Sequence, residues 1–306
     1  MEVWIPITIC AAFFQNIRTA LQKYLKGRLS TGGATYVRFF YGLPFALIYL
    51  WALHEFGGFE FFTPTQEFAV YVVVGGLSQI LATALLVALF ALRNFAIGTT
   101  YSKTETVQAA VFGVVLLGDS LSTPALIAIG ISLVGIMLIS ASGSRLTVRE
   151  VLVGWTGKSA LFGLLSGGLF GVSAVSYRAA ALSLGGDGAI MQAATALAYV
   201  LLFQTIAMTL YLIVFEKGQL STVVRNWRVA GWVGVTGMLG SVGWFTAMAM
   251  QNAAYVRAVG QIELVFTFLI SYFYFKEKTN KNEAAGVALI VIGILVLVLG
   301  STTKVT

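Results

Sequence analysis

The sequence predicts an all-α membrane protein with ten transmembrane helices, arranged as two inverted five-helix repeats around a central cavity. Of the 306 residues, 58% are hydrophobic and only 10% are charged, which is more apolar surface than a soluble domain of this size can bury. The apolar runs are each roughly 18 to 25 residues long, the length of helix that crosses a bilayer. The sequence also contains an internal repeat with five predicted spans per copy. Because five is an odd number, the second copy is expected to cross the membrane in the opposite orientation to the first.

The predicted spans follow one another with short connections, so the chain has no room for a separate soluble domain. The first repeat is expected over 1–141 and the second over 159–306, joined by a loop at 142–158. Within them, the apolar runs lie near residues 4–22, 34–53, 68–92, 95–117, 123–141, 159–182, 188–214, 229–250, 255–275 and 283–300.

The repeat is visible as polar residues and glycines that recur at one constant separation. In each pair the second residue follows the first by 158 positions, and the pairs are Asn94 with Asn252, Glu105 with Glu263, Asp119 with Glu277, and Gly135 with Gly293. In each copy one acid opens a long apolar run and a second acid closes it. A carboxylate inside an apolar helix is energetically unfavourable in lipid, so such residues usually face a cavity or a partner.

The charges are sorted between alternate loops, and this sorting predicts the orientation in the membrane. Lysine and arginine gather in the loops after the odd-numbered spans, which places those loops in the cytoplasm and both termini outside. The net charge of +7 is therefore topological, and no nucleic-acid partner is expected. We expect a multi-pass protein of the bacterial inner membrane. The basic loop residues are Lys23, Lys26, Arg28, Arg93, Arg145, Arg149, Lys158, Lys217, Arg225, Arg228, Lys276, Lys278 and Lys281.

The pattern of a glutamate, an apolar run and then Leu-Leu-Gly-acid, at Glu105 to Asp119, resembles the EamA family of the drug/metabolite transporter superfamily. The opening glutamate, the apolar run and the closing acid return at Glu263 to Glu277, so the resemblance covers essentially the whole chain. It implies ten helices in two inverted halves, a central cavity and alternating access. Family members often carry proline after the first glutamate of the motif. Here Thr106 and Leu264 stand in that place, which puts the expected helix kink in question.

Two intramembrane acids and one base are the first candidates for a solute site. Glu105 and Glu263 either bind a cationic group or carry a proton, or they hold the fold together through a hydrogen bond or salt bridge, and the sequence supports both readings about equally. Lys103 is the deepest base and the best candidate for contacting an anionic group of a solute. Lys103 and Glu105 are two apart on one helix and cannot face each other, so each needs a partner elsewhere.

Further candidates for the wall of the site are polar or aromatic residues inside the spans. The alternative to a place in the site for Arg18 and Arg38 is a side chain that extends to the lipid headgroups. The same headgroup position is expected as an alternative for Arg257, which lies near a span end. The aromatic residues are otherwise expected in the interfacial belt or in packing. The full set of predicted solute-binding residues is Lys103, Glu105, Glu263, Gln261, Tyr101, Trp244, Arg18, Arg38, Arg178 and Tyr177.

The sequence disfavours an enzyme and favours a transporter over a channel. The chain has one histidine, His54, and one cysteine, Cys10, so it lacks the His and Cys clusters of metal sites. No cofactor is expected. Acids and bases together suit a small zwitterionic solute such as an amino acid, moved by a monomer or homodimer, with export preferred on family grounds. Proton coupling through Glu105 or Glu263 is the simplest driving force, and uniport or exchange fits equally well. The alternative is a channel or receptor-like membrane protein.

Overall fold

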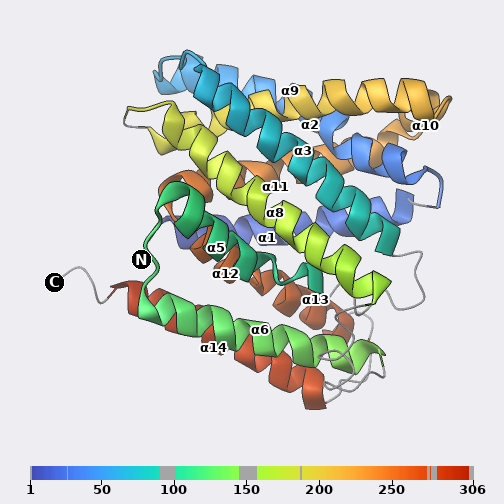
Figure 1. The fold of residues 1–306 in the computed structure, drawn as a ribbon. Coiled ribbons are helices and arrows are strands. Elements are labelled where there is room, and N and C mark those ends of the chain that lie inside the picture. The colour runs from blue at the N-terminus through green and yellow to red at the C-terminus, as the bar shows by residue number, and fades with distance from the viewer. Residues whose placement is uncertain are drawn as a thin grey trace. The chain divides into compact units, whose positions relative to one another are not determined.

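The computed structural model describes residues 2–25, 27–89, 101–144, 157–186, 188–273, 276 and 281–302, and every regular element in those ranges is a helix (Figure 1). The repeat residues Asn94 and Glu277, the start of the fourth predicted span and several basic loop residues lie outside the described residues. The helices are α1 (Trp4–Leu25), α2 (Thr31–Gly57), α3 (Gln66–Leu89), α5 (Glu105–Leu117), α6 (Thr123–Ser144), α8 (Lys158–Ser183), α9 (Ala189–Phe215), α10 (Gln219–Arg225), α11 (Trp227–Met250), α12 (Ala253–Gly260), α13 (Ile262–Phe273) and α14 (Lys281–Thr302).

The chain folds into two compact units, and each unit takes residues from both halves of the sequence. Unit 1 comprises residues 1–80 and 173–252, and unit 2 comprises residues 81–172 and 253–306. The boundaries fall inside α3 and α8, so these two helices contribute residues to both units. Each unit therefore combines helices of the first predicted repeat with helices of the second.

Unit 1 is a helical bundle in which α11 packs against α1, α2 and α9. Glycines of α11 let these neighbours approach closely, as expected for helix contacts without a hydrophobic driving force. A Cβ atom added at Gly243 would lie 2.7 Å from the Cβ of Ala11 on α1. One added at Gly237 would lie 3.2 Å from Cδ of Arg18. A Cβ atom added at Gly234 would come within 2.7 Å of backbone and side-chain atoms of Tyr41 on α2, so glycines of α11 form a packing surface for α1 and α2.

The start of α2 is fixed by polar groups from the segment that follows α9. Ser30 is the N-cap of α2, and its hydroxyl accepts a hydrogen bond from the backbone N–H of Gly33 at 2.9 Å. The same hydroxyl donates to the carboxylate of Glu216, and the side-chain oxygen of Gln219 accepts from the backbone N–H of Ser30 at 3.2 Å. A carboxylate beside a helix N-terminus is favourable because the unpaired N–H groups there carry partial positive charge.

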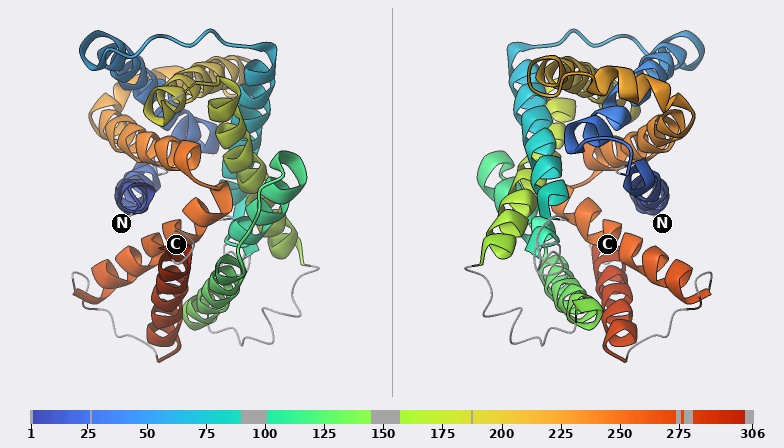
Figure 2. Two further views of the ribbon diagram at one scale, coloured as in Figure 1. Left: turned by 90° about the vertical axis from the view of Figure 1, so that its left-hand side faces the viewer. Right: turned by 90° about the vertical axis from the view of Figure 1, so that its right-hand side faces the viewer.

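Unit 2 is dominated by the pair α6 and α14, which lie side by side (Figures 1 and 2). Gly135 and Gly286 face each other in this pair. A Cβ atom added at either glycine would lie 2.6 Å from the carbonyl oxygen of the other, so neither position accepts a side chain without separating the helices. Further contacts within unit 2 join α12 to α5, α6 and α14, and α13 to α14. The broken segment α12–α13 thus lies against helices of both repeats.

The end of α5 gives a physical reason for the Leu-Leu-Gly-acid motif. Gly118 adopts the left-handed conformation with φ 67°, which a residue with a side chain rarely takes. Its N–H donates to the carbonyl of Val114 at 3.2 Å, and the N–H of Asp119 donates to the carbonyl of Gly113 at 3.1 Å. The bond from the left-handed Gly118 to the carbonyl four residues back is that of an αL helix end, so the motif stops the helix at this place.

The structure confirms an all-helical fold for the described residues and shows that two predicted spans are interrupted. Six of the described helices, namely α2, α3, α8, α9, α11 and α14, are long and apolar enough to cross a bilayer, and two shorter apolar helices coincide with α5 and α6. The described part of the fourth predicted span, near 95–117, is interrupted at residues 103–104, and the ninth, expected as one helix near 255–275, is wrong in that form. It is interrupted at Gln261, where α12 ends and α13 begins. The number of ten spans stays a prediction.

Candidate functional site

Two helix breaks define the candidate site, one from each repeat. In the first repeat, residues 101–102 are helical, residues 103–104 form a turn, and α5 begins at Glu105. In the second, α12 ends at Gly260 and α13 begins at Ile262. The breaks occupy equivalent places, because Glu105 and Glu263 are partners in the repeat. In the first repeat the break directly precedes the glutamate, and in the second it lies two residues before it. Neither repeat has proline directly after the glutamate, where the family often carries it.

The breaks place charged side chains at helix ends whose partial charge has the opposite sign. Glu105 and Glu263 lie in the first turns of α5 and α13, where unpaired backbone N–H groups favour a negative charge. Arg257 lies in the last turn of α12, where unpaired carbonyl groups favour a positive charge. These helix ends lower the cost of holding ionised groups within apolar helices.

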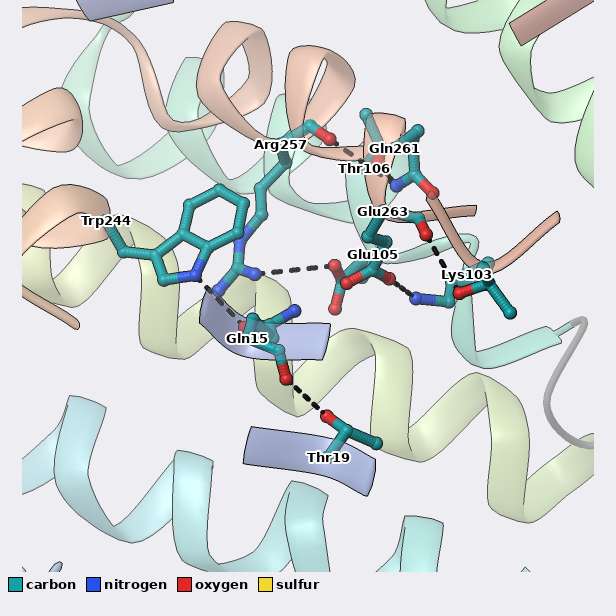
Figure 3. Close-up of polar contacts among 10 residues, drawn as sticks. Gln15, Thr19, Lys103, Glu105, Thr106, Trp244, Arg257, Gln261 and Glu263 are labelled. Carbon is teal, nitrogen blue, oxygen red and sulfur yellow. Dashed lines mark hydrogen bonds and ion pairs between the residues drawn. The ribbon is translucent and has the colours of Figure 1, made fainter. Parts of the chain in front are cut away.

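The two acids form ion pairs with two bases in a crosswise arrangement (Figure 3). The ammonium of Lys103 contacts Oε1 of Glu263 as an ion pair and a hydrogen bond. Nη1 of Arg257 lies 3.5 Å from Oε1 of Glu105. In both pairs one repeat supplies the acid and the other supplies the base. The four charges sum to zero, which is the arrangement that tolerates burial.

The four side chains are mostly shielded, but not equally. Lys103 keeps 27% of its side-chain surface exposed, whereas Glu263 keeps 11%, Arg257 keeps 11% and Glu105 keeps 14%. The prediction that Lys103 and Glu105 each need a partner elsewhere is confirmed. The headgroup-seeking alternative for Arg257 is wrong, because its guanidinium is directed at Glu105. Sequence reasoning left Arg257 out of the predicted site set.

A neutral hydrogen bond links the two breaks beside the ion pairs. Nε2 of Gln261 donates to Oγ1 of Thr106 at 2.9 Å and also lies 3.4 Å from the carbonyl oxygen of Arg257. Gln261 is only 2% exposed and Thr106 only 4%. Thr106 stands where the family often has proline, so in this chain a hydroxyl at that place joins α5 to the break between α12 and α13.

Tyr101 is buried and packs with Ala160 and Leu164.

The repeat duplicates the acids of the site but not its bases. By the same separation that relates Glu105 to Glu263, Lys103 corresponds to Gln261 and Arg257 corresponds to Thr99. One cation is therefore an ammonium from the first repeat and the other is a guanidinium from the second. The site has two equivalent carboxylates and two chemically different positive groups.

The other five predicted residues belong to unit 1, and two of them have clear structural roles there. Nη1 of Arg178 donates to the carbonyl oxygens of Met248 at 2.9 Å and Gln251 at 2.8 Å. These are carbonyls at the C-terminal end of α11, where a cation is favourable. Tyr177 is 2% exposed, and its hydroxyl donates to the carbonyl of Gly75 at 3.1 Å. Both residues therefore hold helices of unit 1 together.

Trp244, Arg18 and Arg38 complete the predicted set, also within unit 1. Nε1 of Trp244 donates to Oε1 of Gln15 on α1 at 3.0 Å (Figure 3). Arg38 is 9% exposed and its guanidinium lies 5.0 Å from the centroid of the Phe39 ring. Arg18 is half-buried against Gly237 of α11. The alternative that Arg38 extends to the lipid headgroups is wrong, because the residue is buried.

Among the described residues, no group of three or more His, Cys, Asp or Glu side chains is placed to hold a metal ion. The described side chains at the two breaks offer paired charges and hydrogen-bonding groups: carboxylates that bind cations or protons, and an ammonium and a guanidinium that bind anions.

Comparison with known proteins agrees with this architecture. The sequence pattern of the EamA-like transporter family matches residues 2–141 and 157–299, which confirms the resemblance drawn from the repeated motif. A solved structure described only as the crystal structure of a protein aligns over 100% of both chains, with a TM-score of 0.70 and 16% sequence identity. At that identity the likeness concerns the fold alone. No curated protein sequence matches this chain.

Proposed function

Because this chain belongs to the EamA-like transporter family, we propose that it moves a small polar or amphipathic organic solute across the membrane by alternating access. An amino acid or a related metabolite is the proposed class of solute, and export the proposed direction. The proposal places two inverted five-helix repeats, 1–141 and 159–306, in the bacterial inner membrane, as a monomer or homodimer.

The crosswise ion pairs at the two helix breaks are the observation that carries this proposal. Transporters with internal repeats commonly place their solute sites at discontinuous helices, where half-helix ends and nearby side chains bind charged groups. Here Lys103 and Arg257 offer two cations, and Glu105 and Glu263 offer two anions. A zwitterion carries one group of each kind, so it can exchange partners with both pairs without leaving an unpaired charge.

The same contacts support a role as a switch. Each ion pair joins helices of different repeats, and a solute that engages one member of a pair weakens the link between those helices. A ligand shifts a conformational equilibrium only through different interactions with the two states. Competition for the ion-pairing groups is such a difference. A static channel would draw no comparable advantage from closed pairs of opposite charge.

Counterflow in liposomes is the test of this function. A thermal-shift screen of the purified protein against amino acids and organic acids first selects a ligand, because binding to the native state raises the melting temperature. Liposomes preloaded with that ligand should then accumulate the labelled ligand transiently and saturably. Ion conductance without counterflow would identify a channel and end the proposal.

The proposed orientation is tested separately with single cysteines. The only native cysteine, Cys10, is replaced by serine, and cysteine is introduced at Thr63 or at Lys217, both of which are exposed. Thr63→Cys should react with an impermeant maleimide in intact cells, and Lys217→Cys only after permeabilisation. The reverse pattern would overturn the orientation inferred from the basic loops.

A further inference from the structure

The first helix break is held by side-chain hydrogen bonds that start at Gln108, at the end of the first turn of α5. Nε2 of Gln108 donates to Oγ1 of Thr104 at 2.8 Å, and this hydroxyl donates to the carbonyl oxygen of Tyr101 at 2.6 Å. The backbone N–H of Thr104 donates to the same carbonyl at 3.1 Å. In a continuous α-helix that carbonyl would accept from the N–H of residue 105, so the bonds from Thr104 favour an interrupted helix.

The same amide fixes the break to α8 within unit 2. Nε2 of Gln108 also donates to the carbonyl oxygen of Leu164 at 3.3 Å. Two glycines of α8 leave room for this contact. A Cβ atom added at Gly168 would lie 2.6 Å from Oε1 of Gln108, and one added at Gly167 would lie 3.3 Å from the backbone nitrogen of Glu105. The break therefore packs directly against the backbone of α8.

The second copy of the repeat lacks these side chains. By the separation of 158 positions, Thr104 corresponds to Ile262 and Gln108 corresponds to Phe266, neither of which forms side-chain hydrogen bonds. The second break is instead joined to α5 by the hydrogen bond that Thr106 accepts. The second break is thus held by a contact to the first repeat, and the first break is held by α8.

Two charged residues of the site lie directly beside Thr104. Lys103 precedes it in the turn, and Glu105 follows it as the first residue of α5. A shift of the turn would move the ammonium and the carboxylate together, and each of them is paired with a residue of the second repeat. A misplacement of about 1 Å in a functional group can cost roughly a hundredfold in rate.

We propose that Gln108 is a positioning residue of the candidate site. Through the hydroxyl of Thr104 it holds Lys103 and Glu105 where the two crosswise ion pairs form. Its effect on a solute rests on the proposed function, whereas its effect on the ion pairs does not.

The coupling between Lys103 and Glu263 tests this role without any solute. It is measured from melting temperatures of the purified full-length chain, as the amount by which the loss in the Lys103→Gln and Glu263→Gln double variant falls short of the sum of the single losses. Gln108→Leu removes the donor, and in this background the coupling should fall to about half or less. Thr104→Val should act in the same way, whereas Thr104→Ser keeps the hydroxyl and should keep the coupling.

Gln204→Leu is the matched control, because Gln204 joins two helices of unit 1 through the same kind of side chain. Its Nε2 donates to Oε1 of Gln79 at 2.9 Å and to the carbonyl oxygen of Gly76 at 3.2 Å. The loss of these bonds should lower the melting temperature as well. The coupling between Lys103 and Glu263 should be the same in this background as in the wild type.

Counterflow of radiolabelled L-alanine in liposomes extends the test to the solute. Gln108→Leu and Thr104→Val should raise KM about tenfold, and Gln204→Leu and Thr104→Ser should leave KM unchanged. Wild-type liposomes without counterflow of L-alanine would count against the proposed class of solute, and the coupling would still decide the role of Gln108.

Two results would overturn the proposal. The first is an unchanged coupling between Lys103 and Glu263 in both Gln108→Leu and Thr104→Val. The second is an equal loss of coupling in Gln204→Leu, which would show that the ion pair responds to any loss of stability and not to the position of the turn.

Discussion

Lys103 and Glu263 form an ion pair although 160 residues separate them in the sequence. The first repeat supplies the ammonium and the second supplies the carboxylate, next to a helix break in each. The pair therefore joins two segments that lie far apart in the sequence. The coupling free energy between the two side chains can be measured directly.

Removing one member of this pair should be more harmful than removing both. Glu263→Gln or Lys103→Gln leaves a partly buried charge without its partner, and we expect each to lower the free energy of unfolding by about 2–4 kcal/mol. In the double variant no unpaired charge remains, so its loss should be smaller than the sum of the two single losses. Thermal unfolding in detergent provides the measurement, and simple additivity would contradict the pairing.

The carboxylates should control the response of transport to pH. Glutamine at position 105 or 263 cannot bind or release a proton, so Glu105→Gln or Glu263→Gln should leave a folded protein with an altered rate or a flattened pH profile. Glu67→Gln, at an exposed position in the first turn of α3, is the matched control and should behave as the wild type. A normal rate and a normal pH profile in both site variants would refute a proton-carrying role.

Glycines within α11 should differ sharply in their tolerance of a methyl group. At Gly243 a Cβ atom would meet Ala11 of α1 at 2.7 Å, whereas at Gly231 nothing lies within 4 Å. Gly243→Ala should therefore destabilise the protein by about 1–3 kcal/mol. Gly231→Ala should be neutral or stabilise it by up to about 1 kcal/mol, because alanine favours helix. Melting temperatures of the two variants check this, and equal shifts would refute close packing of α1 on α11.

Arg178 should matter for stability more than for solute affinity. Arg178→Ala removes two hydrogen bonds from a charged donor to the end of α11, which should lower the free energy of unfolding by about 2–3 kcal/mol. The KM of the protein that remains folded should be unchanged. A raised KM with an unchanged melting temperature would restore Arg178 to the solute-binding set that the sequence suggested.

The sequence was informative where the duplication repeats a residue type. Glu105 and Glu263 share a register, and the structure places both at helix breaks. Their partners could not be found in this way, because neither Lys103 nor Arg257 has a basic counterpart in the other repeat. Pairing between residues more than 150 positions apart depends on how helices pack, which apolar periodicity does not encode.

The helix breaks were missed for a different reason. Proline is the usual sequence signal of an interrupted helix, and Thr106 and Leu264 occupy the family's proline positions. Here the side chains of Gln261 and Thr106 form a hydrogen bond, and each charged group lies at a helix end whose partial charge has the opposite sign. Likewise, nothing in the sequence distinguishes a helix-capping role for Arg178 from a solute-binding role, because the carbonyls that it meets lie about 70 residues further along the chain.

The mixing of both repeats in each unit has a consequence for how the protein is made. The helix α1 packs against α11, yet about 200 residues of chain separate them. At translation rates of roughly 5–20 residues per second, α1 leaves the ribosome some 10–40 s before its partner exists. During that interval the face of α1 that packs on α11 must be shielded by lipid or by the insertion machinery, so biogenesis of this chain waits for its second half.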